Sequence, residues 1–156
     1  MDIFQALHTL EKLEGTLAET YRGLGKRLEG DPPLAAVFTR LSAEETDHLN
    51  LVRYQLRLAR QNPGQFSDIP MDSSHLDLAT RSVEALKTGL VTLSPREAVA
   101  TAIRCEQSTA EAYYRTALAK AYPGLAKLVA AMSSGCDSHA SALLELATAR
   151  NWLPKA

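Results

Sequence analysis

Apolar residues recur at spacings of three and four positions through most of the chain, which is the pattern of helices that bury one face. No stretch alternates apolar and polar residues over the length of a strand. The pattern predicts four long helices and one short one, at about 2–30, 34–62, 75–89, 94–122 and 124–152. The long helices would each have about 26 to 30 residues, or roughly 40 Å at ~1.5 Å per residue. The sequence therefore predicts an all-α protein.

Helix-breaking residues mark the ends of these helices. The segments Gly30–Pro33 and Tyr122–Gly124 join successive long helices tightly, so each couple is expected to form an antiparallel hairpin. Ser94, followed by Pro95 and Glu97, gives the clearest start signal, because serine caps a helix and Glu97 completes a capping box. A polar connection at 65–74 and the short helix after it would let the second hairpin dock on the first. The expected fold is an antiparallel four-helix bundle with one long crossover that carries a short extra helix.

Each long helix carries ionisable groups halfway along its apolar face. They are Glu14 in the first helix, Glu45 and His48 in the second, Glu106 in the third, and Cys136 and His139 in the fourth. Burying a carboxylate costs several kcal/mol unless a partner compensates. No inward Lys or Arg stands at that height, whereas a multivalent cation would neutralise three carboxylates.

The spacing of Glu45 and His48 supports a metal site. Residues three apart share a helix face, so both side chains can reach one ion, and a mixture of oxygen and imidazole ligands suits iron, manganese or zinc. The alternative is an ordinary surface pair on a helix rotated by one position.

The two predicted hairpins also look like copies of each other. Four pairs of equivalent residues lie 91 or 92 positions apart: Glu14 and Glu106, Tyr21 and Tyr113, Glu45 and Cys136, His48 and His139. A pseudo-twofold axis between the hairpins would place two sets of ligands face to face, as a two-metal site requires.

These residues resemble the rubrerythrin-type, ferritin-like di-iron carboxylate proteins over nearly the whole chain, from about Phe4 to Ala149. In that family one Glu from each of two helices joins a Glu-x-x-His from each of the other two. The resemblance implies a ferritin-like bundle that binds one or two iron ions, with manganese or zinc as alternatives. The implied ligands are Glu14, Glu45, His48, Glu106 and His139, and the hydroxyls of Tyr21 and Tyr113 would hydrogen-bond ligand carboxylates. The competing interpretation of both tyrosines is that they are ordinary buried residues.

The chain departs from the family pattern in its second hairpin. Cys136 stands where a bridging Glu is expected, Gly135 replaces the neighbouring acid, and Thr109 stands where the family has an extra Glu. The chain also lacks a C-terminal CxxC rubredoxin-like module. A mononuclear site, an asymmetric site and a site with a metal–thiolate bond all remain open, and Cys136 is either a ligand or an inert buried thiol.

The amino-acid composition argues against several classes of function. The chain has 156 residues, 46% of them hydrophobic and 22% charged, which fits a single domain over 1–156. Its 17 basic and 18 acidic residues give a net charge of −1, which argues against a nucleic-acid binder. No apolar run approaches the roughly 20 residues of a membrane span. The first residues do not read as a secretory signal, and the two cysteines suggest no disulfide framework, so a cytoplasmic location is expected.

Three functions follow as hypotheses. The first is a non-haem iron oxidoreductase that, as the resemblance implies, reduces peroxide or oxidises ferrous iron and takes electrons from an external donor. The second is a non-catalytic bundle that holds one metal ion or none. The third is a sensor in which Cys136 is a redox-sensitive switch. A homodimer is expected by analogy with the family.

Overall fold

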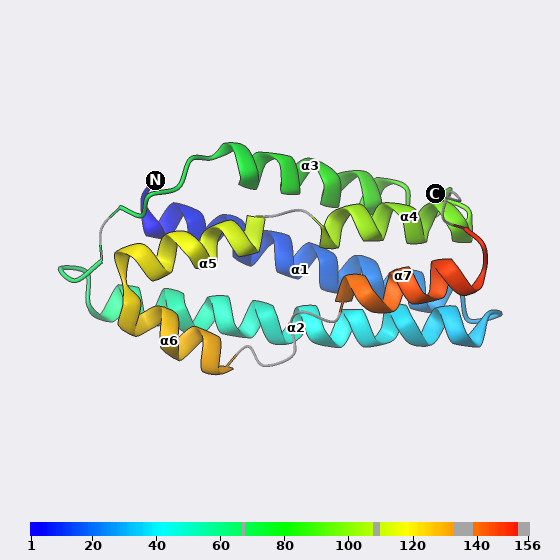
Figure 1. Cartoon of the computed structure of the whole chain (residues 1–156), viewed down its shortest axis with the longest axis horizontal. Helices are drawn as coiled ribbons and strands as arrows, with labels where there is room; N and C mark the ends of the chain where they lie inside the picture. The colour runs from blue at the N-terminus through cyan, green and yellow to red at the C-terminus, as the bar shows by residue number, and fades with distance from the viewer. Residues whose placement is uncertain (67, 108–109, 133–138, 153–156) are drawn as a thin grey trace.

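The chain is all-α in the computed structural model, which describes residues 1–66, 68–107, 110–132 and 139–152 (Figure 1). The helices are α1 (Ile3–Arg27), α2 (Pro32–Gln61), α3 (Ser74–Thr88), α4 (Pro95–Glu106), α5 (Ala110–Ala121), α6 (Pro123–Met132) and α7 (His139–Ala149). No strand occurs in those four described ranges. The all-α prediction is confirmed.

The first predicted hairpin is present, and α1 and α2 run side by side along the length of the molecule (Figure 1). Aspartates cap both helices, because the Asp2 side chain accepts from the Phe4 amide at 2.9 Å and the Asp31 side chain accepts from the Leu34 amide at 3.4 Å. The turn between them is also held by Arg150, whose guanidinium donates to both carboxylate oxygens of Asp31. Arg150 lowers the pKa of Asp31 by this interaction.

The third long helix differs from the prediction, because α4 ends within its predicted range. The predicted capping box at Ser94 is present and begins α4, but α4 ends at Glu106 and α5 begins at Ala110. The fourth helix is described as α6, which ends at Met132, and α7, which begins at His139, and residues 133–138 lie outside the described part of the chain. Ser108, Thr109 and the Ser- and Gly-rich stretch at 133–138 have low helix propensity, a signal in the sequence that the predicted continuous helices did not use. In Figure 1, α5 lies beside α6 at one end of the molecule, and α4 lies beside α7 at the other.

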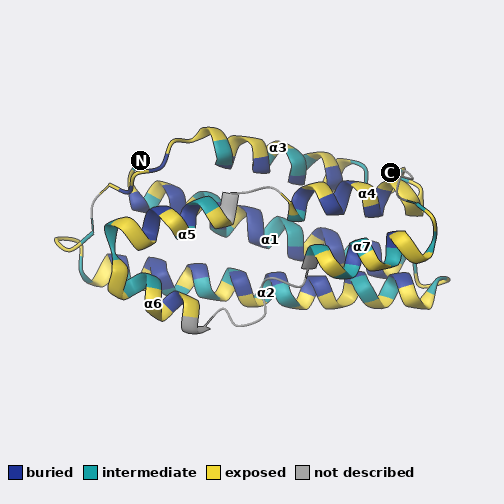
Figure 2. Ribbon diagram, in the orientation of Figure 1, coloured by how far each residue is buried: buried dark blue, intermediate teal, exposed yellow. Residues whose placement is uncertain are grey.

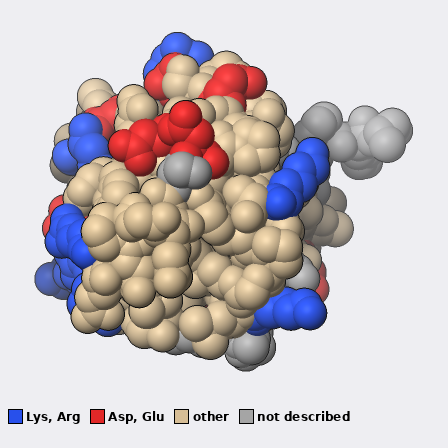
Figure 3. Space-filling view, turned by 90° about the vertical axis from the view of Figure 1, so that its left-hand side faces the viewer, with Lys and Arg blue, Asp and Glu red and all other residues tan. Residues whose placement is uncertain are grey.

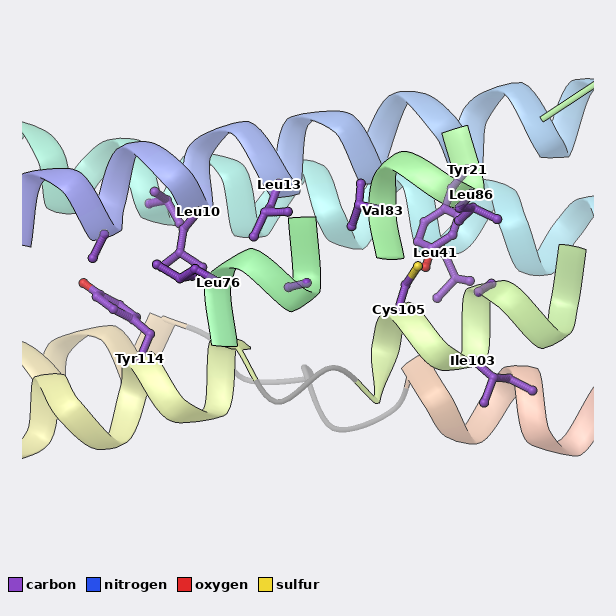
Figure 4. Close-up of a cluster of buried hydrophobic side chains, with 14 of the residues drawn as sticks. Leu10, Leu13, Tyr21, Leu41, Leu76, Val83, Leu86, Ile103, Cys105 and Tyr114 are labelled. Atoms are coloured by element: carbon purple, nitrogen blue, oxygen red, sulfur yellow. The ribbon is translucent and has the colours of Figure 1, made fainter. Parts of the chain in front are cut away.

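The short helix of the crossover is present as α3, and it packs against α1, α4 and α5. Figure 4 shows Leu76, Val83 and Leu86 of α3 directed toward α1 and buried. The crossover is also tied to the start of the chain, because the Ile69 amide donates to the Met1 carbonyl at 2.8 Å. The α-amino group of Met1 donates back to the Ile69 carbonyl at 3.1 Å.

Each helix buries one side and exposes the other (Figure 2). The predicted apolar faces of the first two helices form much of the core, with Leu7, Leu24, Leu34 and Phe38 fully buried. Leu128, placed on the buried face of the fourth helix by the sequence pattern, is instead 40% exposed in α6. Figure 3 views the end of the molecule to the left in Figure 1, where most of the surface is uncharged and Lys and Arg lie at its margin.

Within the described part of the chain, none of the helices combines the length and the apolar character that crossing a membrane requires.

Candidate metal centre

Three of the predicted ligands lie together between α1 and α2, near the middle of both helices. Glu14 of α1 is 6% exposed, and Glu45 and His48 of α2 are 2% and 9% exposed, which is unusual for groups that ionise in water. One ligand atom from each residue lies within 4.8 Å of the other two. The prediction that Glu45 and His48 face inward on one side of their helix is confirmed.

The hairpin register that brings these residues together is fixed close to the site. Ser42 is buried one turn before Glu45, and its hydroxyl donates to the Ala18 carbonyl of α1 at 2.8 Å. Gly15 follows Glu14 and faces Leu49 of α2, where an added Cβ would meet the leucine at 3.8 Å. The two helices therefore approach closely at the height of the site, and a slide of one along the other would break the Ser42 hydrogen bond.

The distances in the group suit a single transition-metal ion. His48 Nδ1 lies 3.2 Å from Glu45 Oε2 and 3.8 Å from Glu14 Oε2. Because nitrogen and carboxylate ligands lie about 2.0–2.2 Å from such an ion, two ligands at tetrahedral or octahedral angles are roughly 3.0 to 3.4 Å apart. The His48–Glu45 separation is already in that range, and the His48–Glu14 separation needs to shorten by only a few tenths of an ångström. The donor set and the geometry both fit a metal ion.

The predicted ligand Glu106 is not in this group, and its carboxylate instead accepts a hydrogen bond from the Tyr21 hydroxyl. Tyr21 is fully buried. Burial raises the pKa of Tyr21 well above its usual value, and the negative charges of Glu106 and Glu45 raise it further. The Tyr21 hydroxyl therefore stays protonated and remains a donor to Glu106. The predicted contact between Tyr21 and a candidate carboxylate is present.

The other half of the predicted ligand set lies outside what the structure describes. Cys136 is outside the described residues, and so is the side chain of His139, the first residue of α7. The predictions for these two residues remain predictions.

The tyrosine buried in α5 is Tyr114, whereas Tyr113, which the continuous helix pattern placed inward, is half-buried and stacks on the His75 ring with centroids 4.0 Å apart. Tyr114 is 2% exposed, and its hydroxyl donates to Gln55 Oε1 of α2 at 2.7 Å. Because α4 ends at Glu106 and α5 begins at Ala110, the face that α5 buries need not continue the phase of α4. Sequence reasoning missed Tyr114 and Gln55, although an interior glutamine on the apolar face of α2 was a signal available in the sequence.

Tyr114 and Gln55 border a small cavity that Glu14 and His48 also line, with a volume of ≈20 Å³. A cavity needs roughly 10–15 Å³ to hold one water molecule. A molecule of that size therefore fits beside two of the three candidate ligands.

Cys105 lies beside Glu106 but packs in the core, near Tyr21 and Leu41 (Figure 4). Burial raises the pKa of the Cys105 thiol to about 12, with a smaller contribution from the charge of Glu106. The thiol is thus protonated near neutral pH. This agrees with the expectation that Cys105 serves packing.

Comparison of the chain with known protein families, with curated proteins and with solved structures finds no match.

Proposed function

We propose that this chain is a metal-binding helical protein in which Glu14, Glu45 and His48 hold an iron ion, with manganese or zinc as the other ions that suit the ligands. The observation that carries the proposal is the burial of two carboxylates and one imidazole with ligand atoms within 4.8 Å of one another. The fold would then be a ferritin-like four-helix bundle of the rubrerythrin type. A second ion would need Glu106 and His139.

The chain's own residues would do three things at this centre. Glu14 and Glu45 supply negative charge, and His48 supplies a neutral nitrogen ligand. Tyr21 fixes the carboxylate of Glu106 through its hydroxyl, and so positions it for a second ion. Apolar neighbours such as Leu10 and Val52 limit the water that reaches the ligands.

A bound iron ion would supply redox chemistry with dioxygen or peroxide, and the resemblance to rubrerythrins favours peroxide reduction or ferrous-iron oxidation with an external electron donor. A protein that holds one ion without turnover is the second candidate. The observation that favours it is the position of Glu106, whose carboxylate is engaged by Tyr21 and lies outside the Glu14–Glu45–His48 group.

The test is metal content after reconstitution with ferrous iron under anaerobic conditions. The wild-type chain should retain about one ion per chain after desalting, as expected for three clustered ligands. His48→Gln should retain almost none, while His8→Gln, which changes an exposed histidine of α1, should match the wild type. Equal retention by both variants would contradict the proposal.

Peroxide consumption by the loaded protein then separates the two candidates. Consumption that His48→Gln abolishes and His8→Gln leaves intact supports the oxidoreductase. Full metal binding with no consumption of peroxide and no oxidation of added ferrous iron supports the protein that only holds an ion.

A further inference from the structure

Side chains of α5 and α6 line a groove. These two helices lie side by side at one end of the molecule (Figure 1). The volume of the groove is ≈180 Å³, and it is lined by Arg115, Leu118, Ala119, Ala126, Val129 and Ala130. Ala119 and Ala130 are exposed, so the groove opens to solvent, whereas Leu118 and Val129 are buried, so it reaches the core.

The groove and the cavity beside the candidate ligands share two lining residues. Arg115 and Val129 line the groove and also line the ≈20 Å³ cavity that Glu14 and His48 border. In Figure 4 the Tyr114 hydroxyl points toward α1 near Leu10, and both residues line that inner cavity. The two spaces are therefore neighbours, with the side chains of Arg115 and Val129 lining both.

We propose that the α5–α6 groove is the access route by which a small uncharged molecule of the size of dioxygen reaches Glu14 and His48. The inference rests on the proposed metal centre for what the molecule meets at the end of the route. The route itself is a property of the metal-free chain and can be tested without an ion.

The residues that line the groove determine which class of molecule can pass through it. Apart from Arg115, the described side chains along the groove are alkyl groups, and none of them is acidic. A cation would lose its hydration there and meet only the positive charge of Arg115, which is costly, whereas dioxygen loses almost nothing. The inner cavity admits about one molecule of the size of water, so larger substrates are excluded. The metal ion itself would enter by another path.

Side-chain motion at Val129 would complete the route. Val129 is 4% exposed and, as a valine in a helix, strongly prefers one χ1 rotamer, so its two methyl groups open the route only during brief excursions from that rotamer. Fluctuations of this kind occur on the nanosecond scale or slower in packed interiors. The route is therefore gated by packing and needs no rearrangement of helices.

The first test measures where dissolved oxygen spends time in the metal-free wild-type chain. Oxygen is paramagnetic, so it speeds the nuclear relaxation of methyl groups that it approaches. Under oxygen pressure, the enhancement at the methyls of Val129 and Val52 should be at least about twofold larger than at Val83 and Leu56, because apolar cavities take up small apolar molecules. Val83 and Leu56 are matched controls, each 3% exposed. Equal enhancement at all four residues overturns the proposal.

The second test blocks the groove. Ala126→Phe should lower the enhancement at Val52 to the level of Val83, while Ala112→Phe, at an exposed position of the same bundle end, should leave it unchanged. If Ala126→Phe does not fold, Ala119→Phe blocks the outer, exposed part of the groove instead. An enhancement at Val52 that survives the groove variants overturns the route.

The proposed metal centre and the proposed access route can be refuted independently of each other. Titration of the wild-type chain with Mn²⁺ reports on the centre alone, since the oxygen measurements use metal-free protein. Absence of Mn²⁺ binding at Glu14, Glu45 and His48 would refute the proposed function, and the oxygen measurements would still decide whether the groove leads to the inner cavity.

Discussion

Replacing Glu14 by Gln should stabilise the metal-free protein, although it removes a candidate ligand. Glu14 and Glu45 are both buried, and their ligand oxygens lie within 4.8 Å of each other. Two full negative charges at that separation repel by about 3.5 kcal/mol at an effective dielectric constant of ~20. Glutamine keeps the size and the hydrogen-bonding capacity of the side chain but removes one charge, so the repulsion is relieved.

The net gain should be smaller than this repulsion, because His48 lies within 3.8 Å of Glu14 and Arg115 lines the cavity that Glu14 borders. After allowance for partial compensation, we expect Glu14→Gln to raise the unfolding free energy of the metal-free chain by about 1–3 kcal/mol at pH 8. This corresponds to a rise in Tm of about 3 to 10 °C.

The assay is thermal and urea unfolding of the metal-free chain, followed by circular dichroism, with and without added Mn²⁺. Glu19→Gln, an exposed substitution of the same kind in α1, is the control and should change stability by no more than about 0.5 kcal/mol. Added metal should stabilise the wild type and the control but not Glu14→Gln. A metal-free Glu14→Gln chain that is less stable than wild type at pH 8 would refute the idea that repulsion between Glu14 and Glu45 destabilises the metal-free protein.

Two further outcomes follow from the buried groups beside the site. Tyr21→Phe should lower the free energy of unfolding, measured by urea unfolding, by about 1.5–3 kcal/mol, because the Glu106 carboxylate loses its buried donor. The control Tyr54→Phe should lower it far less. Similar losses in the two variants would contradict the role of Tyr21 as the donor to Glu106. In a Cys136→Ser background at pH 8, Cys105 should react with a thiol reagent at least about a thousandfold more slowly in the folded chain than after unfolding, because burial raises its pKa from 9.0 to about 12. Since the unfolded thiol ionises first, Cys105 should also make the folded state less stable as pH rises above about 9. Labelling of the folded chain at the unfolded rate would contradict both statements.

The first hairpin and the Glu14–Glu45–His48 group could be predicted from the sequence, because the helix caps and the residue spacings that indicate them are local and agree with one another. Asp2 and Asp31 mark the helix starts, and Glu45 and His48 share a face by their spacing alone. Placing Glu14 at the same height needed only a tight turn between two uninterrupted helices. These are the conditions under which apolar periodicity determines which side chains meet.

The second hairpin was predicted less accurately than the first, because apolar periodicity alone does not show where one helix ends and the next begins. Because α4 ends at Glu106 and α5 begins anew at Ala110, the phase of one does not fix that of the other, and Tyr114 rather than Tyr113 is buried. The cavity beside Glu14 and the groove that adjoins it depend on side chains from α1, α2, α5 and α6 packing around the same space. No pattern within one helix carries that information.

The most direct measurement is anomalous X-ray scattering from crystals of the full chain soaked with Mn²⁺ or grown with iron. We predict an anomalous peak about 2.0–2.3 Å from a carboxylate oxygen of Glu14, a carboxylate oxygen of Glu45 and a ring nitrogen of His48. Peaks confined to surface carboxylates, with Glu14, Glu45 and His48 well ordered and no density between them, would contradict the metal centre proposed for this chain.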